Sequence, residues 1–297
     1  MDATVIQREV RALGAHFNAA INEATRAIYR DQINLGTAGE EWRDVAYGEH
    51  ARHRLDLYRP ASASRGIVIF VHGGGFVGGD KNSDGVFYVN VGRWLARSGW
   101  TAVVPNYRLA PSAPWPAGAQ DVSEVVRWVR ANASEIAAKQ APLVVWGQSA
   151  GACHVASWLF QSHPTEHATE RVSAVMLMSG FYQAQAPIAD GPRAYFGGNP
   201  ALYADRSPLT HVTAPGIPVW LGLAELEPPE IAQHTYALAS ALTFACGNGP
   251  EFRMFRGHNH VSTVQGLGSA QEDVAAEILR FLQALEAPSH VTLEGTP

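Results

Sequence analysis

The chain has 297 residues, of which 46% are hydrophobic, so it can bury the core of one α/β domain. Its 22 basic and 27 acidic side chains give a net charge of -5 without any basic run, which argues against nucleic acid or an anionic membrane as partner. The expected partner is therefore a small molecule.

The two cysteines, Cys153 and Cys246, lie far apart and without the spacing of metal ligands. Neither a disulfide framework nor a zinc site is implied. The N-terminus is charged, and no later stretch is apolar and long enough to span a bilayer. We expect a cytoplasmic protein that does not associate with membranes.

The first segment of the chain is amphipathic. Between residues 6 and 28, apolar residues recur three or four positions apart, with polar residues between them. This period predicts a helix that precedes the first strand. Residues 44–48 and 53–60 then alternate between apolar and polar, which predicts a hairpin at the edge of a sheet.

A glycine run follows the first buried strand. Residues 66–71 are apolar without alternation, and they lead directly into His72-Gly73-Gly74-Gly75-Phe76. Three glycines in a row let backbone amides turn toward a developing oxyanion, where each donor is worth about 3 to 4 kcal/mol of barrier. A flexible linker is the alternative, and Gly78 and Gly79 would suit it. The strand before the run favours an ordered loop.

The centre of the chain reads as strand, tight turn and helix. Residues 143–146 are apolar, Gly147-Gln148-Ser149-Ala150-Gly151 follows, and residues 152–159 suit a helix. A serine at such a turn is strained and exposed above the sheet, and the crowding requires small residues two positions before and after it. The helix would direct its positive N-terminal end at charge developing beside Ser149.

The remaining elements alternate between strands and helices. This alternation implies a mostly parallel sheet with helices on both faces. Residues 183–212 lack a clear period, which suggests a functional excursion. The predicted helices are residues 86–98, 121–137, 231–242 and 271–285, and the further strands are residues 100–105, 172–178, 218–223 and 251–256.

A serine nucleophile needs a base and an orienting carboxylate, and in this architecture they follow it in the order acid, then histidine. Glu225 and Glu227 follow the strand at 218–223, and His258 and His260 follow the last strand. The pattern of residues alone leaves both choices open.

Taken together, these motifs resemble the hormone-sensitive-lipase-like branch of the α/β-hydrolases, which includes microbial carboxylesterases and the related arylformamidases. The resemblance covers residues 47–285. The segments that carry it are residues 72–76, 106–111 with Pro116, Ala117 and Asp121, 147–151, 224–229 and 257–261.

The resemblance implies an α/β-hydrolase fold with a mostly parallel eight-stranded sheet and a small cap. Residues 1–42 would form an N-terminal helical cap segment and residues 43–297 the hydrolase domain. In related enzymes the segment before the first strand lies over the mouth of the active site. Neither a cofactor nor a metal is implied.

The resemblance also implies roles for single residues. It assigns the oxyanion amides to Gly74, Gly75 and Ala150. It favours Glu227 as the acid over Glu225, although the family more often has Asp there.

His260 is favoured over His258, because the family's histidine precedes a bulky apolar residue and Val261 follows His260. Ser112 stands where the family has an acid, so that acid's contact is absent here. The substrate pocket is expected to include Phe76, Phe181, Tyr182 and Val261.

Three functions compete. The leading one is a serine carboxylesterase that acts on small esters through an acyl-enzyme. An arylformamidase would use the same residues on an N-formyl amide. A binding protein without catalysis, like the gibberellin receptors that resemble this family, is disfavoured because such receptors lack the histidine. The expected partner is a small ester or amide, with a homodimer as a further option.

Overall fold

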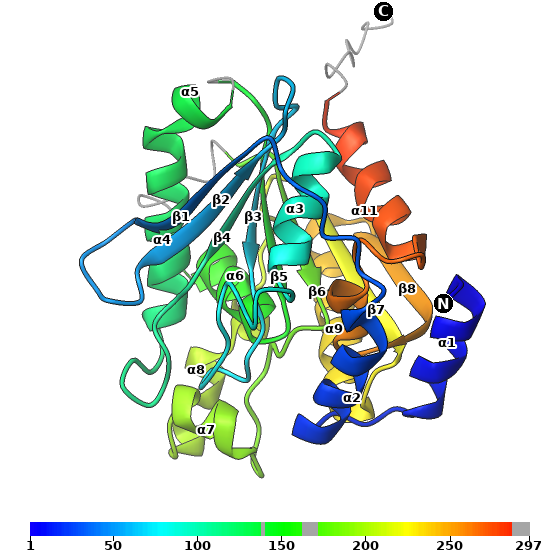
Figure 1. Ribbon diagram of the computed structural model, residues 1–297. Helices are drawn as coiled ribbons and strands as arrows, with labels where there is room; N and C mark the ends of the chain where they lie inside the picture. Colours follow the sequence, from blue (N-terminus) through cyan, green and yellow to red (C-terminus); the bar gives the residue numbers. More distant parts are fainter. Residues whose placement is uncertain (138–139, 162–171, 287–297) are drawn as a thin grey trace, which may run out of the picture.

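The computed structural model describes residues 1–137, 140–161 and 172–286, and these build one eight-stranded sheet flanked by helices (Figure 1). The strands are β1 (Glu40–Ala46), β2 (Arg54–Arg59), β3 (Ile67–Val71), β4 (Thr101–Pro105), β5 (Leu143–Gln148), β6 (Ala174–Met178), β7 (Val219–Leu226) and β8 (Glu251–Asn259). The helices are α1 (Ala3–Ala12), α2 (Ala19–Arg30), α3 (Val89–Arg97), α4 (Ala117–Ala131), α5 (Ala133–Ile136), α6 (Ala150–Gln161), α7 (Asp190–Phe196), α8 (Tyr203–Arg206), α9 (Pro229–Cys246), α10 (Ser262–Gln265) and α11 (Asp273–Ala284).

The strand order is β1-β2-β4-β3-β5-β6-β7-β8. Strand β2 runs antiparallel to both β1 and β4, whereas every later pair is parallel. The prediction of a mostly parallel sheet with an antiparallel hairpin at one edge is confirmed. Since the carboxyl ends of the parallel strands share one edge, the loops after β3, β5, β7 and β8 meet there.

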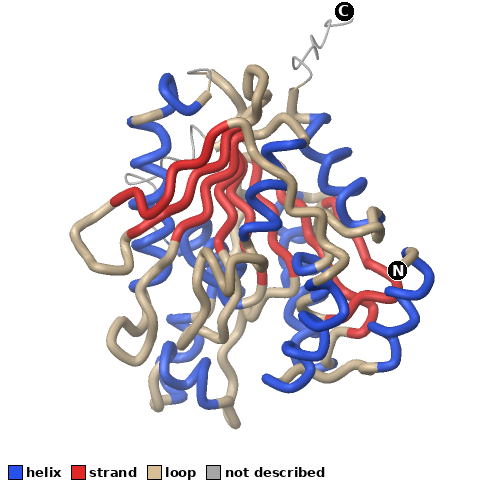
Figure 2. The backbone as a smooth tube through the Cα atoms, in the orientation of Figure 1, coloured by secondary structure: helices blue, strands red, loops and turns tan. Residues whose placement is uncertain are grey.

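Both faces of the sheet are covered, which explains why the parallel strands are apolar without alternation (Figure 2). On β3, Ile67 and Ile69 face one core with α4, α6 and α9, while Val68 and Phe70 face the other with α3 and α11. All four side chains are fully buried. Each such burial stabilises the fold by about 1.5 to 3 kcal/mol.

The single N-terminal helix predicted over residues 6–28 is wrong. The structure has two helices, α1 and α2, because Gly14 adopts a left-handed φ of 71° just after α1. Asn18 then caps α2 by accepting a hydrogen bond from the amide of Ile21. The apolar period continues across this break, so the pattern alone does not reveal it.

Other boundaries shift modestly. The helix predicted over residues 121–137 begins earlier, at Ala117, and divides into α4 and α5. Strand β8 runs to Asn259, three residues beyond the predicted end, and so carries the chain up to His260. The excursion at 183–212 contains the short helices α7 and α8 and the 3₁₀ turns η3 (Pro200–Leu202) and η4 (Pro208–His211).

Three buried histidines make the folded state less stable at low pH. Burial lowers the pKa of His72 and of His234 to about 4 and that of His154 to about 3. The folded state keeps these rings neutral while the unfolded chain protonates them below pH 6.5, so their contribution is present above pH 6.5 and is lost as the pH falls.

We expect each of these histidines to lower the free energy of unfolding as the pH falls below 6.5, with a slope that approaches about 1.4 kcal/mol per pH unit and ends near the pKa of the folded state. Urea denaturation at pH 6.5 and 5.5 measures this slope above the carboxylate range. His154→Leu should flatten it, since neither ring nitrogen of His154 has a hydrogen-bond partner among the described residues. The exposed His16→Leu serves as control. Equal slopes for wild type and His154→Leu would contradict this account.

Candidate active site

The turn between β5 and α6 holds Ser149 in a strained conformation. Its φ of 55° is unusual for a residue with a side chain, and its amide donates to the carbonyl of Met178 on β6 at 2.9 Å. A Cβ on Gly151 would lie 2.1 Å from the carbonyl oxygen of Val71, and one on Gly147 would lie 2.5 Å from Cα of Ala152. Only glycine fits at either place, as the sequence predicts.

Ser149 heads a chain of hydrogen bonds through His260 to Glu227. The hydroxyl of Ser149 lies 2.9 Å from Nε2 of His260, and Nδ1 of the same ring contacts Oε1 of Glu227. The side chains of His260 and Glu227 are each 1% exposed. A carboxylate at Nδ1 fixes the tautomer that leaves Nε2 free to accept the serine proton. These three residues are called the Ser149–His260–Glu227 chain below.

A second serine, Ser179, completes the surroundings of the carboxylate. It follows β6 with a φ of 51°, is fully buried, and donates its hydroxyl to Oε2 of Glu227 at 2.5 Å. Both oxygens of the glutamate are therefore engaged, which keeps the longer side chain in one orientation. Sequence reasoning gave Ser179 no role, because a serine after a strand carries no distinguishing pattern.

Gln148 links the turn to the histidine loop. Its side chain donates from Nε2 to the backbone carbonyl of His260 at 3.0 Å, and it is 1% exposed. A Cβ on Gly73 would lie 2.4 Å from its Oε1, so the glutamine also packs against the glycine loop. This residue was predicted only as the variable position of the motif.

The alternative residues lie elsewhere. His258 is buried, with Nδ1 2.9 Å from the hydroxyl of Ser262 and Nε2 3.2 Å from Asp273. The carboxylate of Glu225 is one-third exposed, forms an ion pair with Arg11 at 2.7 Å and accepts from the amide of Gly257. The structure therefore does not bring His258 or Glu225 into the Ser149–His260–Glu227 chain.

The glycine loop opens toward solvent beside Ser149. Gly74 and Gly75 have φ values of 151° and 59° and are exposed, and the carbonyl of Gly74 accepts from the amide of Gly78 at 3.0 Å. A Cβ on Gly75 would meet nothing within 4 Å, which leaves room for a ligand. Ala150 is the first residue of α6.

Asn106 holds the base of this loop. Its Oδ1 accepts from the amide of Lys81 at 2.7 Å and lies 3.1 Å from Nε2 of His72. Its Nδ2 donates to Asp80 at 2.8 Å. The loop is thus ordered by side-chain contacts rather than free to move as a linker, which supports the first of the two sequence interpretations.

Aromatic side chains gather next to the glycine loop. Phe76 stacks on Tyr195 with ring centroids 4.8 Å apart, and Phe181 lies between Phe76 and His234, at 6.1 and 4.5 Å. Of the residues expected to line the pocket, Phe181 is partly exposed, whereas Phe76 and Val261 are 3% and 5% exposed.

The prediction that Tyr182 lines the pocket is wrong. Its side chain is fully buried and belongs to the core beneath the sheet, with Val155 and Leu177 among the members of that core. Phe181 and Tyr182 lie in a segment without helix or turn, and the second of the two side chains enters the core. A run of two aromatics does not reveal which of them faces the site.

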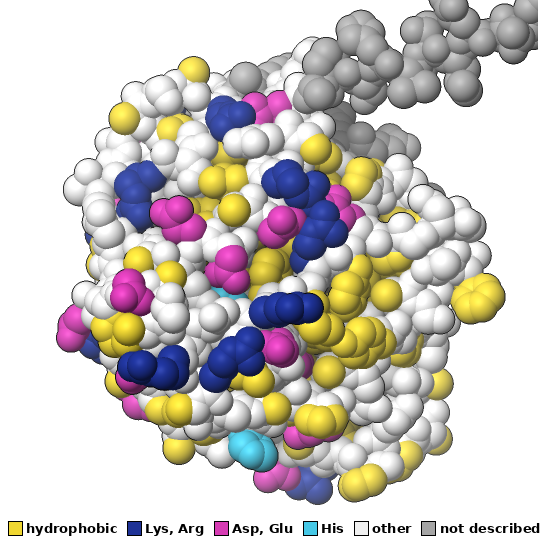
Figure 3. All heavy atoms as spheres, turned by 90° about the vertical axis from the view of Figure 1, so that its right-hand side faces the viewer, with side chains coloured by type: hydrophobic (Ala, Val, Ile, Leu, Met, Phe, Trp, Pro, Cys, Tyr) yellow, Lys and Arg dark blue, Asp and Glu magenta, His cyan; other side chains and the backbone are white. Residues whose placement is uncertain are grey.

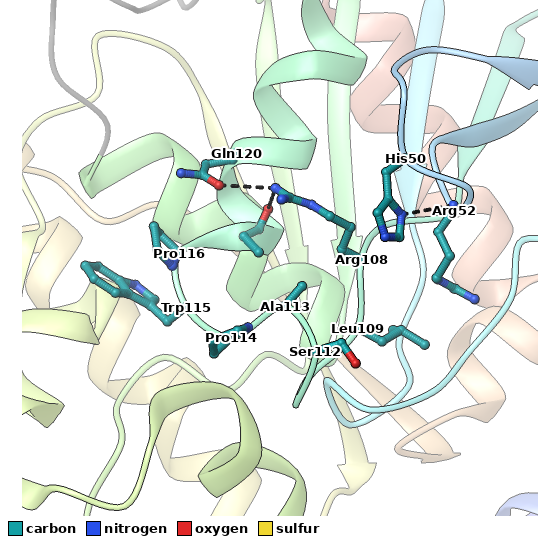
Figure 4. A pocket seen from close by; sticks show the side chains of 11 residues that line it. His50, Arg52, Arg108, Leu109, Ser112, Ala113, Pro114, Trp115, Pro116 and Gln120 are labelled. Atoms are coloured by element: carbon teal, nitrogen blue, oxygen red, sulfur yellow. Dashed lines mark hydrogen bonds between the residues drawn. The ribbon is translucent and has the colours of Figure 1, made fainter.

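A cavity of about 600 Å³ lies apart from Ser149, around the loop that carries Ser112 (Figure 4). Arg108 crosses it and donates to the side chain of Gln120 and to the carbonyl of Ala117. The same arginine pairs with the buried Asp121 at 2.7 Å. The charge of Arg108 is thereby compensated by a carboxylate of α4.

Known proteins share parts of this sequence and this fold. Residues 55–180 match the family model named BD-FAE. The structure superposes on an arylesterase with a TM-score of 0.71 at 19% identity, over 96% of this chain and 97% of that one. An esterase from Pyrobaculum calidifontis gives a TM-score of 0.71 at 21% identity, over 96% and 98% of the two chains.

This chain has the α/β-hydrolase fold. The chain also resembles two proteins of Mycobacterium tuberculosis: “Probable carboxylic ester hydrolase LipM”, 28% identical over 65% of this chain, and “Esterase LipC”, 29% identical over 58%. The resemblance to hormone-sensitive-lipase-like esterases is confirmed. The matched part spans about half of each relative, 48% and 47%.

Among the described residues of this chain, no helix is long and apolar enough to cross a membrane.

Proposed function

We propose that the protein is a serine carboxylesterase that cleaves small carboxylic esters. The observation that carries the proposal is the Ser149–His260–Glu227 chain, in which a strained serine at the start of a helix is hydrogen bonded to an oriented imidazole. Esters are favoured over other acyl compounds because the relatives with matching sequence are named esterases.

In the proposed acylation, Oγ of Ser149 attacks the ester carbonyl carbon and its proton passes to Nε2 of His260. The amides of Gly74, Gly75 and Ala150 would stabilise the oxyanion of the tetrahedral intermediate. When the intermediate collapses, the bond to the alcohol oxygen breaks and His260 returns the proton to the leaving alcohol.

Deacylation repeats these steps with water. His260 accepts a proton from water as the water attacks the acyl carbon, and the bond to Oγ of Ser149 breaks while the proton returns to that oxygen. The acid is released and the serine is restored. No cofactor enters either half of the reaction.

A cap formed by residues 1–42 is part of the proposal. Its support is Phe17, which follows α1 and whose ring centroid lies 4.3 Å from that of His260. A cover at this place would exclude water from the acyl pocket. The boundary with a hydrolase domain at 43–297, a cytoplasmic location and a homodimer remain predictions, and residues 287–297 lie outside the described part.

Short acyl chains are the expected substrates, because aromatic rings crowd the space next to the glycine loop. We expect kcat/KM on p-nitrophenyl esters to be highest for acetate or butyrate and to fall at least tenfold toward dodecanoate. The measurement is initial rates over the series, with N-formyl-kynurenine in parallel and Ser149→Ala as the blank.

Two outcomes would change the proposal. A kcat/KM for N-formyl-kynurenine well above that of the best ester would assign the protein to the arylformamidases. Equal rates for wild type and Ser149→Ala on every substrate would show that the serine is not the nucleophile.

A further inference from the structure

The loop that carries His260 is held by the N-terminal segment. Gln7 of α1 donates to the carbonyl of Arg256 at 3.1 Å. Tyr29 of α2 donates to the side chain of Gln271 at 2.6 Å. In Figure 1 the two blue helices lie against β8 and the start of the orange segment, and α1 packs directly on β8. Residues from opposite ends of the chain thus meet around one loop.

On the outer face formed by α1, β8 and α11, acidic and basic side chains are interspersed with hydrophobic ones (Figure 3). One of these surface contacts is the pair between Arg11 and Glu225. Exposed ion pairs of this kind contribute little to the stability of the fold. The contacts that fix the loop are the buried ones beneath this surface.

Asn259, the residue before His260, is the centre of the buried contacts. It is fully buried, and its Oδ1 accepts from the amides of Val261 at 3.2 Å and Ser262 at 3.0 Å. The side chain therefore spans the turn in which His260 sits. Its Nδ2 donates in turn to the hydroxyl of Thr25 on α2, at 2.9 Å.

The hydroxyl of Thr25 joins its own helix to Asn259 through two hydrogen bonds. Its hydroxyl donates to the carbonyl of Ile21 at 2.8 Å and accepts from Asn259, and the residue is fully buried. Threonine is a weaker helix former than alanine, so α2 alone does not require it. If the hydroxyl were lost, the buried amide of Asn259 would lack its partner and the asparagine would turn.

Phe17 provides an independent contact with the same ring. Its side chain is 41% exposed, and its ring meets that of His260 at an interplanar angle of 55°. The imidazole is thus contacted by Glu227 at Nδ1, by Ser149 at Nε2 and by the tilted ring of Phe17.

We propose that Thr25 is a positioning residue for His260, acting through Asn259. The inference rests on the proposed function, in which His260 moves a proton in both acylation and deacylation. A shift of the ring by a fraction of an ångström lengthens the contact between Nε2 and Ser149 and slows both steps. Substrate binding does not involve Thr25, so KM is affected little.

The test compares Thr25→Val, which keeps the shape but removes the hydroxyl, with Thr25→Ser, which keeps the hydroxyl. We expect kcat on p-nitrophenyl acetate to fall about tenfold in Thr25→Val with KM within about twofold, and Thr25→Ser to stay near wild type. Thr243→Val is the matched control, because Thr243 also donates to the carbonyl four residues earlier, on the exposed face of α9.

Stopped-flow kinetics separates the two half-reactions. The rate of the p-nitrophenol burst reports acylation and the steady state after it reports deacylation, and both should fall in Thr25→Val. A purely structural role would lower the melting temperature and leave both rates unchanged well below it. Wild-type rates in folded Thr25→Val would overturn the proposal, as would a loss in Thr25→Ser equal to that in Thr25→Val.

If Thr25→Val does not fold, Thr25→Ala replaces it, because alanine favours the helix and leaves room for the asparagine. Failure of the proposed function is recognised separately, by wild type lacking turnover above Ser149→Ala. In that case the rate at which phenylmethanesulfonyl fluoride labels Ser149, followed by mass spectrometry, is compared between wild type and Thr25→Val. Slower labelling of Thr25→Val supports the positioning role and equal labelling overturns it.

Discussion

Replacing Ser149 or His260 by alanine is expected to lower kcat on p-nitrophenyl acetate by at least about 10⁴-fold. Each replacement removes one end of the same proton transfer, so the double variant should be little worse than either single one. The fold should persist, since Ser149 is partly exposed at its turn. Circular dichroism and the melting temperature check this point.

His258→Ala provides the comparison for His260→Ala. His258 contacts Ser262 and Asp273 rather than Ser149, so its loss should lower stability while kcat changes less than about tenfold. Loss of turnover in His258→Ala with retention in His260→Ala would reverse the assignment of the base.

Glu227→Gln is expected to lower kcat by about 10³-fold or more. An amide at this place offers an NH₂ group to Nδ1 and so favours the tautomer whose proton sits on Nε2, where the serine must donate. It also leaves the imidazolium without a counter-charge in a site where Glu227 is 1% exposed. KM should change little, because the carboxylate contacts Nδ1 of His260, on the side of the ring away from Ser149.

Glu225→Gln is the matched control two residues away. It weakens only the contacts with Arg11 and the amide of Gly257, so its kcat should stay within about threefold of wild type. If kcat falls by the same factor in Glu227→Gln and Glu225→Gln, the carboxylate of Glu227 is not the group that orients His260.

Much of this arrangement could be predicted because its signals are local. The apolar runs at β3, β5, β6 and β7 are covered on both faces, so their composition alone indicates buried parallel strands. Gly147 and Gly151 are required by backbone atoms that would lie within 2.6 Å of an added Cβ. The order of serine, acid and histidine then narrows the choice to two residues at each remaining place.

The rest depends on contacts between distant residues. Only the fold brings Ser179 into contact with Glu227 and Thr25 into contact with Asn259, since these pairs are 48 and 234 residues apart in the sequence. The break between α1 and α2 was missed because Gly14 interrupts the helix without disturbing the apolar period. Phe17 was predicted as part of a helical stripe, whereas it lies in the connection between the helices and contacts His260.

The contact between Thr25 of α2 and Asn259 also bears on the order in which the site forms. Thr25 is synthesised well before Asn259, and the contact between them closes a loop of more than two hundred residues. Non-local contacts of this kind form late, after local helices and strands. A nascent chain that has completed the turn at Ser149 already contains α2 but still lacks Asn259 and His260. The hydrogen bond between Ser149 and His260 therefore cannot form until residue 260 has been synthesised.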